Sequence, residues 1–304
     1  MQRTLKSYFI ILLKGMAMGA ADVVPGVSGG TIAFISGIYQ ELIETISGIN
    51  LGLITTWKKE GFKAMWHKAN GNFLSALVAG GFISVFSLMK VVHFLLENHP
   101  VKLWAFFFGL VLASIIYIGK QIKNWSAITI LAIIISAVFA FSITQLGTFQ
   151  ESDNLFFLFV AGAIASCAMI LPGISGSFIL VLLGAYATII DAVHNVDITK
   201  IAVVGFGVLT GVLSFSHLLK WLFKNYENLT LAILTGFILG SLNKIWPWKH
   251  TLESIVIDGK TKIIKEASVL PSNFETEPHL LSAIVLAIVG FTFILILEKL
   301  ASKK

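Results

Sequence analysis

Two copies of a short pattern contain the residues of this chain that are best suited to bind a charged ligand. Each copy contains Pro-Gly-X-Ser-Gly, and the copies are residues Val24–Gly30 and Leu171–Ser177. In both copies a Gly-X-Tyr group begins nine residues after the serine, at Gly37 and at Gly184. Proline removes a backbone donor and glycine loosens the chain, so each copy breaks a helix within an apolar stretch. Such breaks at matching places in two halves of a chain are typical of the binding site of a membrane transporter.

The chemistry that these breaks offer is the binding of an anion. The second part of a broken helix begins with N–H groups that have no partner within the helix, and these groups and the helix dipole favour negative charge. Glycine allows close approach to the backbone, and a hydroxyl caps the helix or donates a hydrogen bond. Two such tips that meet near the middle of the membrane would hold a phosphate or a carboxylate; the alternative is a tight turn that the serine merely caps. The predicted binding residues are Gly26, Ser28, Gly29, Gly30, Thr31, Gly173, Ser175, Gly176 and Ser177.

Asp22 distinguishes the first copy from the second, where Met169 takes its place. A carboxylate in an apolar segment is costly and is therefore a candidate functional group. Because burial favours the neutral form of a carboxyl group, Asp22 is a candidate carrier of a coupling proton. Two other roles are open, namely capping the half-helix and pairing with Lys14.

Two lysines inside apolar segments are candidates for guiding an anion to the tips. Lys90 and Lys220 occupy equivalent positions in the two halves, and His93 and His217 each lie three residues from their lysine, on the same helical face. The alternative is that both lysines extend to the membrane surface.

The sequence contains no recognisable catalytic apparatus. It has no cluster of His, Cys or Asp at the spacing of metal ligands and no nucleophile elbow of a serine hydrolase. It also lacks the lysine motif of a nucleotide-binding P-loop and the glycine motif of a dinucleotide-binding fold. We therefore expect no enzyme activity, no cofactor and no metal. A membrane-embedded lipid phosphatase would need a base or a metal beside Ser28 or Ser175, which the sequence does not supply.

Composition indicates a polytopic membrane protein. Of the 304 residues, 56% are hydrophobic and 12% are charged, and the mean hydropathy is +0.87. The net charge of +6 comes from lysines beside apolar runs, so we interpret it as membrane anchoring and not as nucleic-acid binding.

The two halves of the chain have the same order of apolar segments. Residues 1–150 and 151–304 each contain a broken segment, two spans and a last apolar run, and residues 109–114 align with residues 236–241. The predicted fold is therefore all-α, with two repeats that each consist of a broken helical hairpin and three transmembrane helices. Each hairpin has two arms of about 17 residues, roughly 25 Å of helix, and is either re-entrant or fully crossing. Three crossings then separate the hairpins, and this odd number predicts that the repeats are inverted.

The distribution of charge supports this topology. It places both termini and the segment 57–70, predicted as an interfacial helix, on the cytoplasmic side, and the loop 247–279 outside. The same side receives 13 of the 22 basic residues, namely Arg3, Lys6, Lys58, Lys59, Lys63, Lys68, Lys120, Lys123, Lys220, Lys224, Lys299, Lys303 and Lys304.

With its tip motifs at Gly19–Thr31 and Leu171–Ser177, the chain resembles the bacterial polyprenyl-phosphate transporter family over essentially its whole length. The resemblance implies a translocase of the bacterial cytoplasmic membrane that returns undecaprenyl phosphate, the lipid carrier of cell-envelope synthesis, from the outer to the inner leaflet. The phosphate would lie at the two tips, the isoprenoid tail would stay in lipid, and alternating access would come from rocking of the halves. The residues alone lead only to an anion transporter, so a carrier of a water-soluble or phosphorylated anion is the alternative. A homo-oligomer is compatible with either function.

Overall fold

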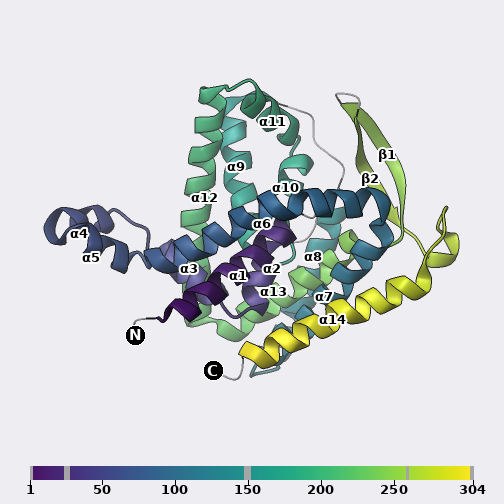
Figure 1. Cartoon of the computed structure of the whole chain (residues 1–304), viewed down its shortest axis with the longest axis horizontal. Coiled ribbons are helices and arrows are strands. Elements are labelled where there is room, and N and C mark those ends of the chain that lie inside the picture. The colour runs from purple at the N-terminus through teal and green to yellow at the C-terminus, as the bar shows by residue number, and fades with distance from the viewer. Residues whose placement is uncertain (1–2, 24–27, 147–151, 258–259, 302–304) are drawn as a thin grey trace.

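The structure is a computed structural model that describes residues 3–23, 28–146, 152–257 and 260–301. Residues 1–150 contain the helices α1 (Leu5–Val23), α2 (Gly29–Ile35), α3 (Tyr39–Ser47), α4 (Gly52–Glu60), α5 (Phe62–Lys68), α6 (Gly71–Asn98), α7 (Pro100–Gln121) and α8 (Ala127–Gln145). Residues 151–304 contain α9 (Leu155–Ile170), α10 (Gly176–Leu182), α11 (Tyr186–His194), α12 (Ile198–Asn225), α13 (Glu227–Ser241), the 3-10 helix η1 (Leu242–Ile245), the strands β1 (Lys249–Ile257) and β2 (Lys260–Ser268), the 3-10 helix η2 (Pro271–Asn273) and α14 (Leu280–Ala301) (Figure 1).

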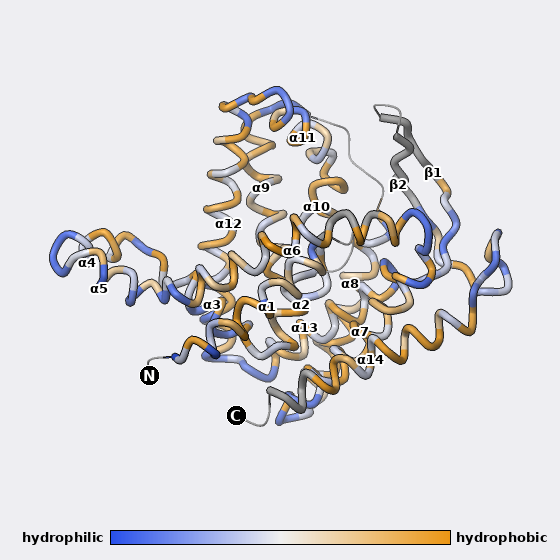
Figure 2. Tube along the Cα trace, viewed as in Figure 1, coloured by the Kyte–Doolittle hydropathy of each residue, from blue (hydrophilic) through white to orange (hydrophobic). Residues whose placement is uncertain are grey.

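The fold is that of an all-α polytopic membrane protein, as predicted. Within the described residues, five helices are long and apolar enough to cross a membrane, and a bent pair of shorter helices, α10 and α11, raises the number to six. Helix α8 illustrates the lipid-facing surface, because Ile128, Ile135 and Val138 are each at least 60% exposed. Figure 2 shows this apolar character along the helices, with hydrophilic residues gathered at their ends and over α4 and α5. A surface of this kind requires lipid to cover it.

Helix pairs within and between the two halves form the body of the protein. Helix α1 packs along α6, and α9 packs along α12, so each half joins its first helix to its first long span. The other two large contacts cross between the halves, with α7 against α14 and α13 against α8. Gly109 and Gly236, which align in the two halves, permit these crossings, because a Cβ there would overlap the backbone carbonyls of Ala287 and Ile133.

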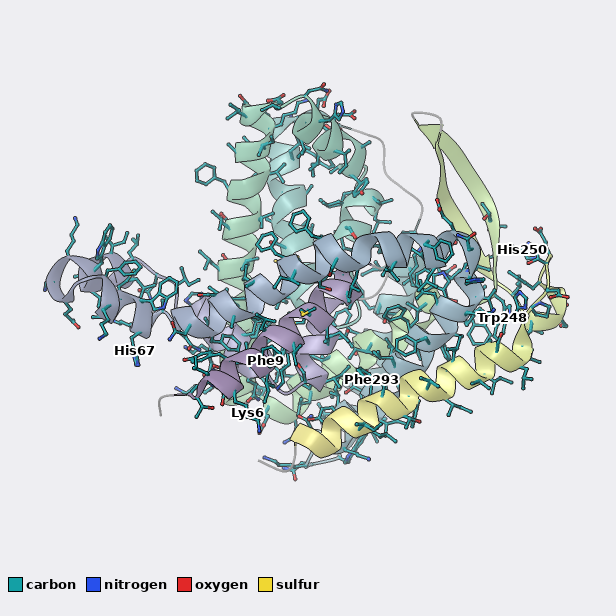
Figure 3. The ribbon with its side chains drawn as sticks, in the orientation of Figure 1. Lys6, Phe9, His67, Trp248, His250 and Phe293 are labelled. Atoms are coloured by element: carbon teal, nitrogen blue, oxygen red, sulfur yellow. The ribbon has the colours of Figure 1, made fainter. Side chains whose placement is uncertain are left out.

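The predicted outer loop 247–279 contains an antiparallel β-hairpin that the sequence analysis did not predict. Strands β1 and β2 pair from Lys249 opposite Ser268 to Ile257 opposite Lys260, with an irregularity near Glu253. Trp248 and His250 lie at the base of this hairpin, close to the first turns of α14 (Figure 3). In Figure 1 the hairpin and α11 lie at the opposite end of the molecule from the two labelled chain ends.

The segment 57–70, predicted as one interfacial helix, is divided between two helices. Helix α4 ends at Glu60, Gly61 has a φ of +85°, and α5 begins at Phe62. The side chains of Trp57 and Phe62 are more than half exposed. Figure 1 shows α4 and α5 extending away from the helix bundle, beyond the start of α6.

Candidate functional site

Both Pro-Gly motifs separate two helices, and both returning arms are broken a second time. Helix α1 ends at Val23 and α2 begins at Gly29, whereas α9 ends at Ile170 and α10 begins at Gly176. Pro25 and Gly26 lie outside the described residues. The continuous arms of about 17 residues that we predicted are therefore wrong on the returning side, where α2 and α10 are each only seven residues long.

The second break is at the Gly-X-Tyr groups. Gly37 and Gly184 have φ angles of +71° and +70°, which favour glycine, and α3 and α11 begin two residues later. Helices α10 and α11 are bent by 106°, as in a broken span or a re-entrant loop.

The two tips contact each other directly. The Ser28 hydroxyl donates to the carbonyl oxygen of Leu171 at 3.2 Å, and the N–H of Gly173 donates to the Thr31 hydroxyl at 2.9 Å. Ser28 and Thr31 are almost fully buried. The predicted meeting of residues from the two motifs is thus present in the fold, 142 and 143 residues apart in the sequence.

At the first tip, the chain's own residues satisfy the first N–H groups of α2. Asp22 Oδ1 accepts from the N–H of Gly29 at 2.7 Å, and Ser28 Oγ accepts from the N–H of Gly30 at 3.1 Å. Asp22 therefore caps the half-helix, one of the roles left open above. Lys14 donates to the carbonyl oxygen of Ser36. All seven residues of α2 are buried, so this tip is closed.

The second tip is more open. The Ser175 side chain makes no capping hydrogen bond, and its hydroxyl lies 2.8 Å from that of Ser177. Of the seven residues of α10, only Ile179 and Leu182 are buried. A cavity adjoins this tip and is lined by Ala140, Ile143, Thr144, Gly173, Ile174, Ser175, Phe178, Ser241 and Lys244.

Several predicted glycines bring segments of the protein itself close together. Gly173 has a φ of +89°, and a Cβ there would lie 2.9 Å from the Ile238 Cα. A Cβ on Gly30 or Gly176 would lie 2.7 Å from a carbonyl oxygen of α9. Close backbone packing thus accounts for these three glycines without a ligand.

The two predicted guiding residues whose side chains are described, Lys220 and His217, do not line the cavity at the second tip. Lys220 is exposed and lines a separate cavity with Gln40 and Glu44 near α3. The His217 ring is also exposed, and its Nδ1 lies 2.7 Å from the carbonyl oxygen of Leu213 on the same helix. Lys90 and His93 belong to α6, but their side chains lie outside the described residues.

Lys244 is the basic residue at the second tip, and the sequence analysis did not select it. Its Nζ lies 4.9 Å from the centre of the Phe178 ring, in the first turn of α10. The available signal was its position just after an apolar run, which is also typical of an ordinary interfacial lysine.

Among the described residues, no group of three His, Cys, Asp or Glu side chains is placed to hold a metal ion.

Comparison with known proteins identifies the family. Residues 18–264 match the VCA0040-like family model, described as undecaprenyl phosphate translocase-like. The chain belongs to this family. It is 44% identical over 302 residues to a polyprenyl-phosphate transporter of Vibrio cholerae, covering 98% of both chains. It is 33% identical over 257 residues to a polyprenyl-phosphate transporter of Staphylococcus aureus, covering 79% of this chain and 86% of that protein. No solved structure matches the chain significantly.

Proposed function

We propose that this chain moves undecaprenyl phosphate from the outer to the inner leaflet of the bacterial cytoplasmic membrane and is not an enzyme. The family and the names of the two relatives support a polyprenyl phosphate as the substrate. The apolar tail would stay in lipid, so the protein has to lower the cost of moving only the charged headgroup through the apolar core.

The observation that carries this proposal is the bond between Asp22 and Gly29. It places a carboxylate oxygen 2.7 Å from the first amide of α2, so the tip geometry presents this amide to an anion. At the second tip, Met169 replaces the carboxylate, and no described side chain accepts from the N–H of Gly176. We propose that the lipid phosphate occupies this place, with hydrogen bonds from the amides of α10 and from the hydroxyls of Ser175 and Ser177.

For the transport cycle we propose two inverted repeats, residues 1–150 and 151–304, that rock against each other around the tips. Their element order supports this arrangement, since α1, α2, α3 and α6 have lengths of 19, 7, 9 and 28 residues and α9 to α12 have lengths of 16, 7, 9 and 28 residues. Asp22 would couple the cycle to protons, because protonation would weaken its bond to Gly29 and loosen the closed tip.

The proposed orientation has both termini in the cytoplasm and the β-hairpin outside. In a background with Cys167 replaced by alanine, we expect Glu60→Cys to react with an impermeant thiol reagent only from the cytoplasmic side. Ser152→Cys should react only from the outside. Reaction of both variants from one side would exclude the proposed inversion.

A leaflet-resolved transport assay tests the function. Purified protein in liposomes should move labelled undecaprenyl phosphate between leaflets, while empty liposomes should not, and a soluble organophosphate such as glycerol phosphate should not be taken up. Uptake of the soluble compound would favour a carrier of water-soluble anions. Release of inorganic phosphate from the lipid would identify a phosphatase.

A further inference from the structure

A compact group of charges lies where the β-hairpin meets the helices. The Nζ atoms of Lys249 and Lys244 lie 3.4 and 3.7 Å from the same oxygen, Oε2 of Glu266. Lys249 also donates to the carbonyl oxygen of Lys244 at 2.7 Å, and its Nζ lies 4.3 Å from the centre of the Trp104 ring. Two lysines thus share one carboxylate, which leaves one net positive charge.

This charge is poorly exposed to water. The side chains of Lys249, Glu266 and Lys244 are only 9%, 24% and 25% exposed. Burial lowers the pKa of Lys249 to about 8, and the nearby charge of Lys244 acts in the same direction, whereas Glu266 opposes both. An additional anion beside the two lysines would therefore stabilise the cluster.

Two neighbouring cavities lie between this cluster and the second tip. The outer cavity is lined by Thr144, Gln145, Leu146, Phe178, Asn243, Lys244, Lys249, Glu266 and Ser268. Thr144, Phe178 and Lys244 also line the cavity beside Ser175, so the two cavities share a wall. Lys244 therefore borders both cavities, whose volumes of about 30 and 10 Å³ mean that the side chains around them have to move apart before a phosphate enters.

The rim of the outer cavity continues onto a lipid-exposed helix. Leu146, which follows α8, is 52% exposed, and Phe141 and Val138 are exposed along the same helix. A ligand with a phosphate at the lysines and an apolar tail along α8 fits this surface, whereas a free phosphate ion would make no use of it.

We propose that Lys244 and Lys249 form an entry site for the phosphate headgroup of a membrane lipid, from which the headgroup passes along Lys244 to Ser175. This inference rests on the proposed function and names the route to its site. Glu266 holds the two ammonium groups in place while the site is empty, and it competes with the phosphate for them.

The base of the hairpin has other anchors, so the lysines can be changed without removing it. The indole N–H of Trp246 donates to the carbonyl oxygen of Val269 at 2.8 Å, and that of Trp248 donates to Pro278 at 2.9 Å. His250 Nδ1 lies 2.7 Å from a carboxylate oxygen of Glu275 (Figure 3 shows Trp248 and His250).

The test measures binding of undecaprenyl phosphate to full-length protein in nanodiscs. We expect Lys244→Gln and Lys249→Gln each to weaken binding by about tenfold or more, as for loss of a hydrogen bond between charged groups. Binding of undecaprenol, which lacks the phosphate, should not change. Lys102→Gln is the matched control, because Lys102 lies on the same proposed side of the membrane and lines neither cavity.

Glu266→Gln separates a headgroup site from a purely structural ion pair. Removal of the competing carboxylate should strengthen binding of the lipid phosphate several-fold, whereas a structural pair would make this variant behave like the lysine variants. Inorganic phosphate should compete with the lipid only at far higher concentration; equal potency would assign the site to soluble phosphate and overturn the proposal.

Transport from a single labelled leaflet distinguishes failure of this inference from failure of the proposed function. The lysine variants should slow transport that starts in the outer leaflet at subsaturating lipid, and excess lipid should restore the rate. If the parent transports and the lysine variants match Lys102→Gln in both assays, the entry site is wrong and the function stands. If the parent neither binds nor transports the lipid, the function itself is wrong.

Discussion

The two tips share one sequence motif and differ in what satisfies it. At the first tip, Asp22 and Ser28 accept from the first amides of α2, and the whole helix is buried. At the second tip, Ser175 caps nothing through its side chain, and Lys244 lines the adjoining cavity. Both serines thus have an extended backbone and precede a seven-residue helix, while one copy already contains its anion. We infer that the first tip is a closed support for the second, which is free to take a ligand.

The largest effect is expected when a carboxylate is placed at the second tip, which makes it resemble the first. Met169→Asp should put a negative charge beside the N–H of Gly176, as Asp22 does for Gly29. Repulsion of the phosphate should cost several kcal/mol, so affinity for undecaprenyl phosphate should fall by about a hundredfold or more. Met169→Asn is the control, because it has the same shape without the charge. Unchanged affinity of the aspartate variant would place the headgroup elsewhere.

Replacement of the two serines should affect different properties, affinity at the second tip and stability at the first. Ser175→Ala should weaken binding of the lipid phosphate by about 1.5–3 kcal/mol, the range for a hydrogen bond to a charged group, with little change in thermal stability. Ser28→Ala should instead lower the stability by about 1–2 kcal/mol, because it removes a helix cap and the bond to Leu171. Melting temperature and affinity are measured for both variants, and the opposite pattern would reverse the roles of the tips.

Asp22→Asn tests whether the closed tip also couples transport to protons. The amide still accepts from Gly29 but without charge, so we expect a loss of about 1 kcal/mol in stability, the usual size of a capping effect. Transport driven by a pH gradient should lose its dependence on the gradient, while binding of the lipid remains. Gradient-dependent transport by this variant would limit Asp22 to capping.

The sequence predicted the membrane fold and the helix breaks because both follow from local composition. The repeated Gly-X-Tyr groups at Gly37 and Gly184 were visible, but the second break was not predicted, since a lone glycine is common within membrane helices. The β-hairpin also had a signal, because the residue pair Asp-Gly at positions 258 and 259 is a sequence pattern typical of hairpins, and it was overlooked in a loop of mixed charge.

The contacts of Lys244 and Asp22 at the two tips could not be predicted from the sequence, because they depend on how distant segments pack. Lys244 lies beside Phe178, 66 residues away, and its role depends on a cavity formed by α8, α10 and η1. The capping role of Asp22 was one of three alternatives, and only the fold, which places its carboxylate on the N–H of Gly29, shows that Asp22 caps the half-helix.

The smallest expected effect concerns pH. It tests whether the lipid phosphate reaches the second tip through Lys249. The pKa of Lys249 is about 8 in the free protein, and a bound phosphate should raise it, so the lysine contributes fully to affinity below pH 8 and less as the pH rises above it. If this contribution is about tenfold, affinity should fall by about fivefold between pH 7 and pH 9.

Lys244 and Glu266 are the other charged groups described in this cluster. Over this range the phosphate is already largely a dianion. Lys249→Arg keeps its charge at every pH tested and should hold its affinity, whereas Lys249→Gln should bind weakly and show no dependence on pH. Affinity is measured in nanodiscs at each pH with undecaprenyl phosphate. An equal loss in the parent and in Lys249→Arg would assign the pH dependence to another group and remove Lys249 from the route to the second tip.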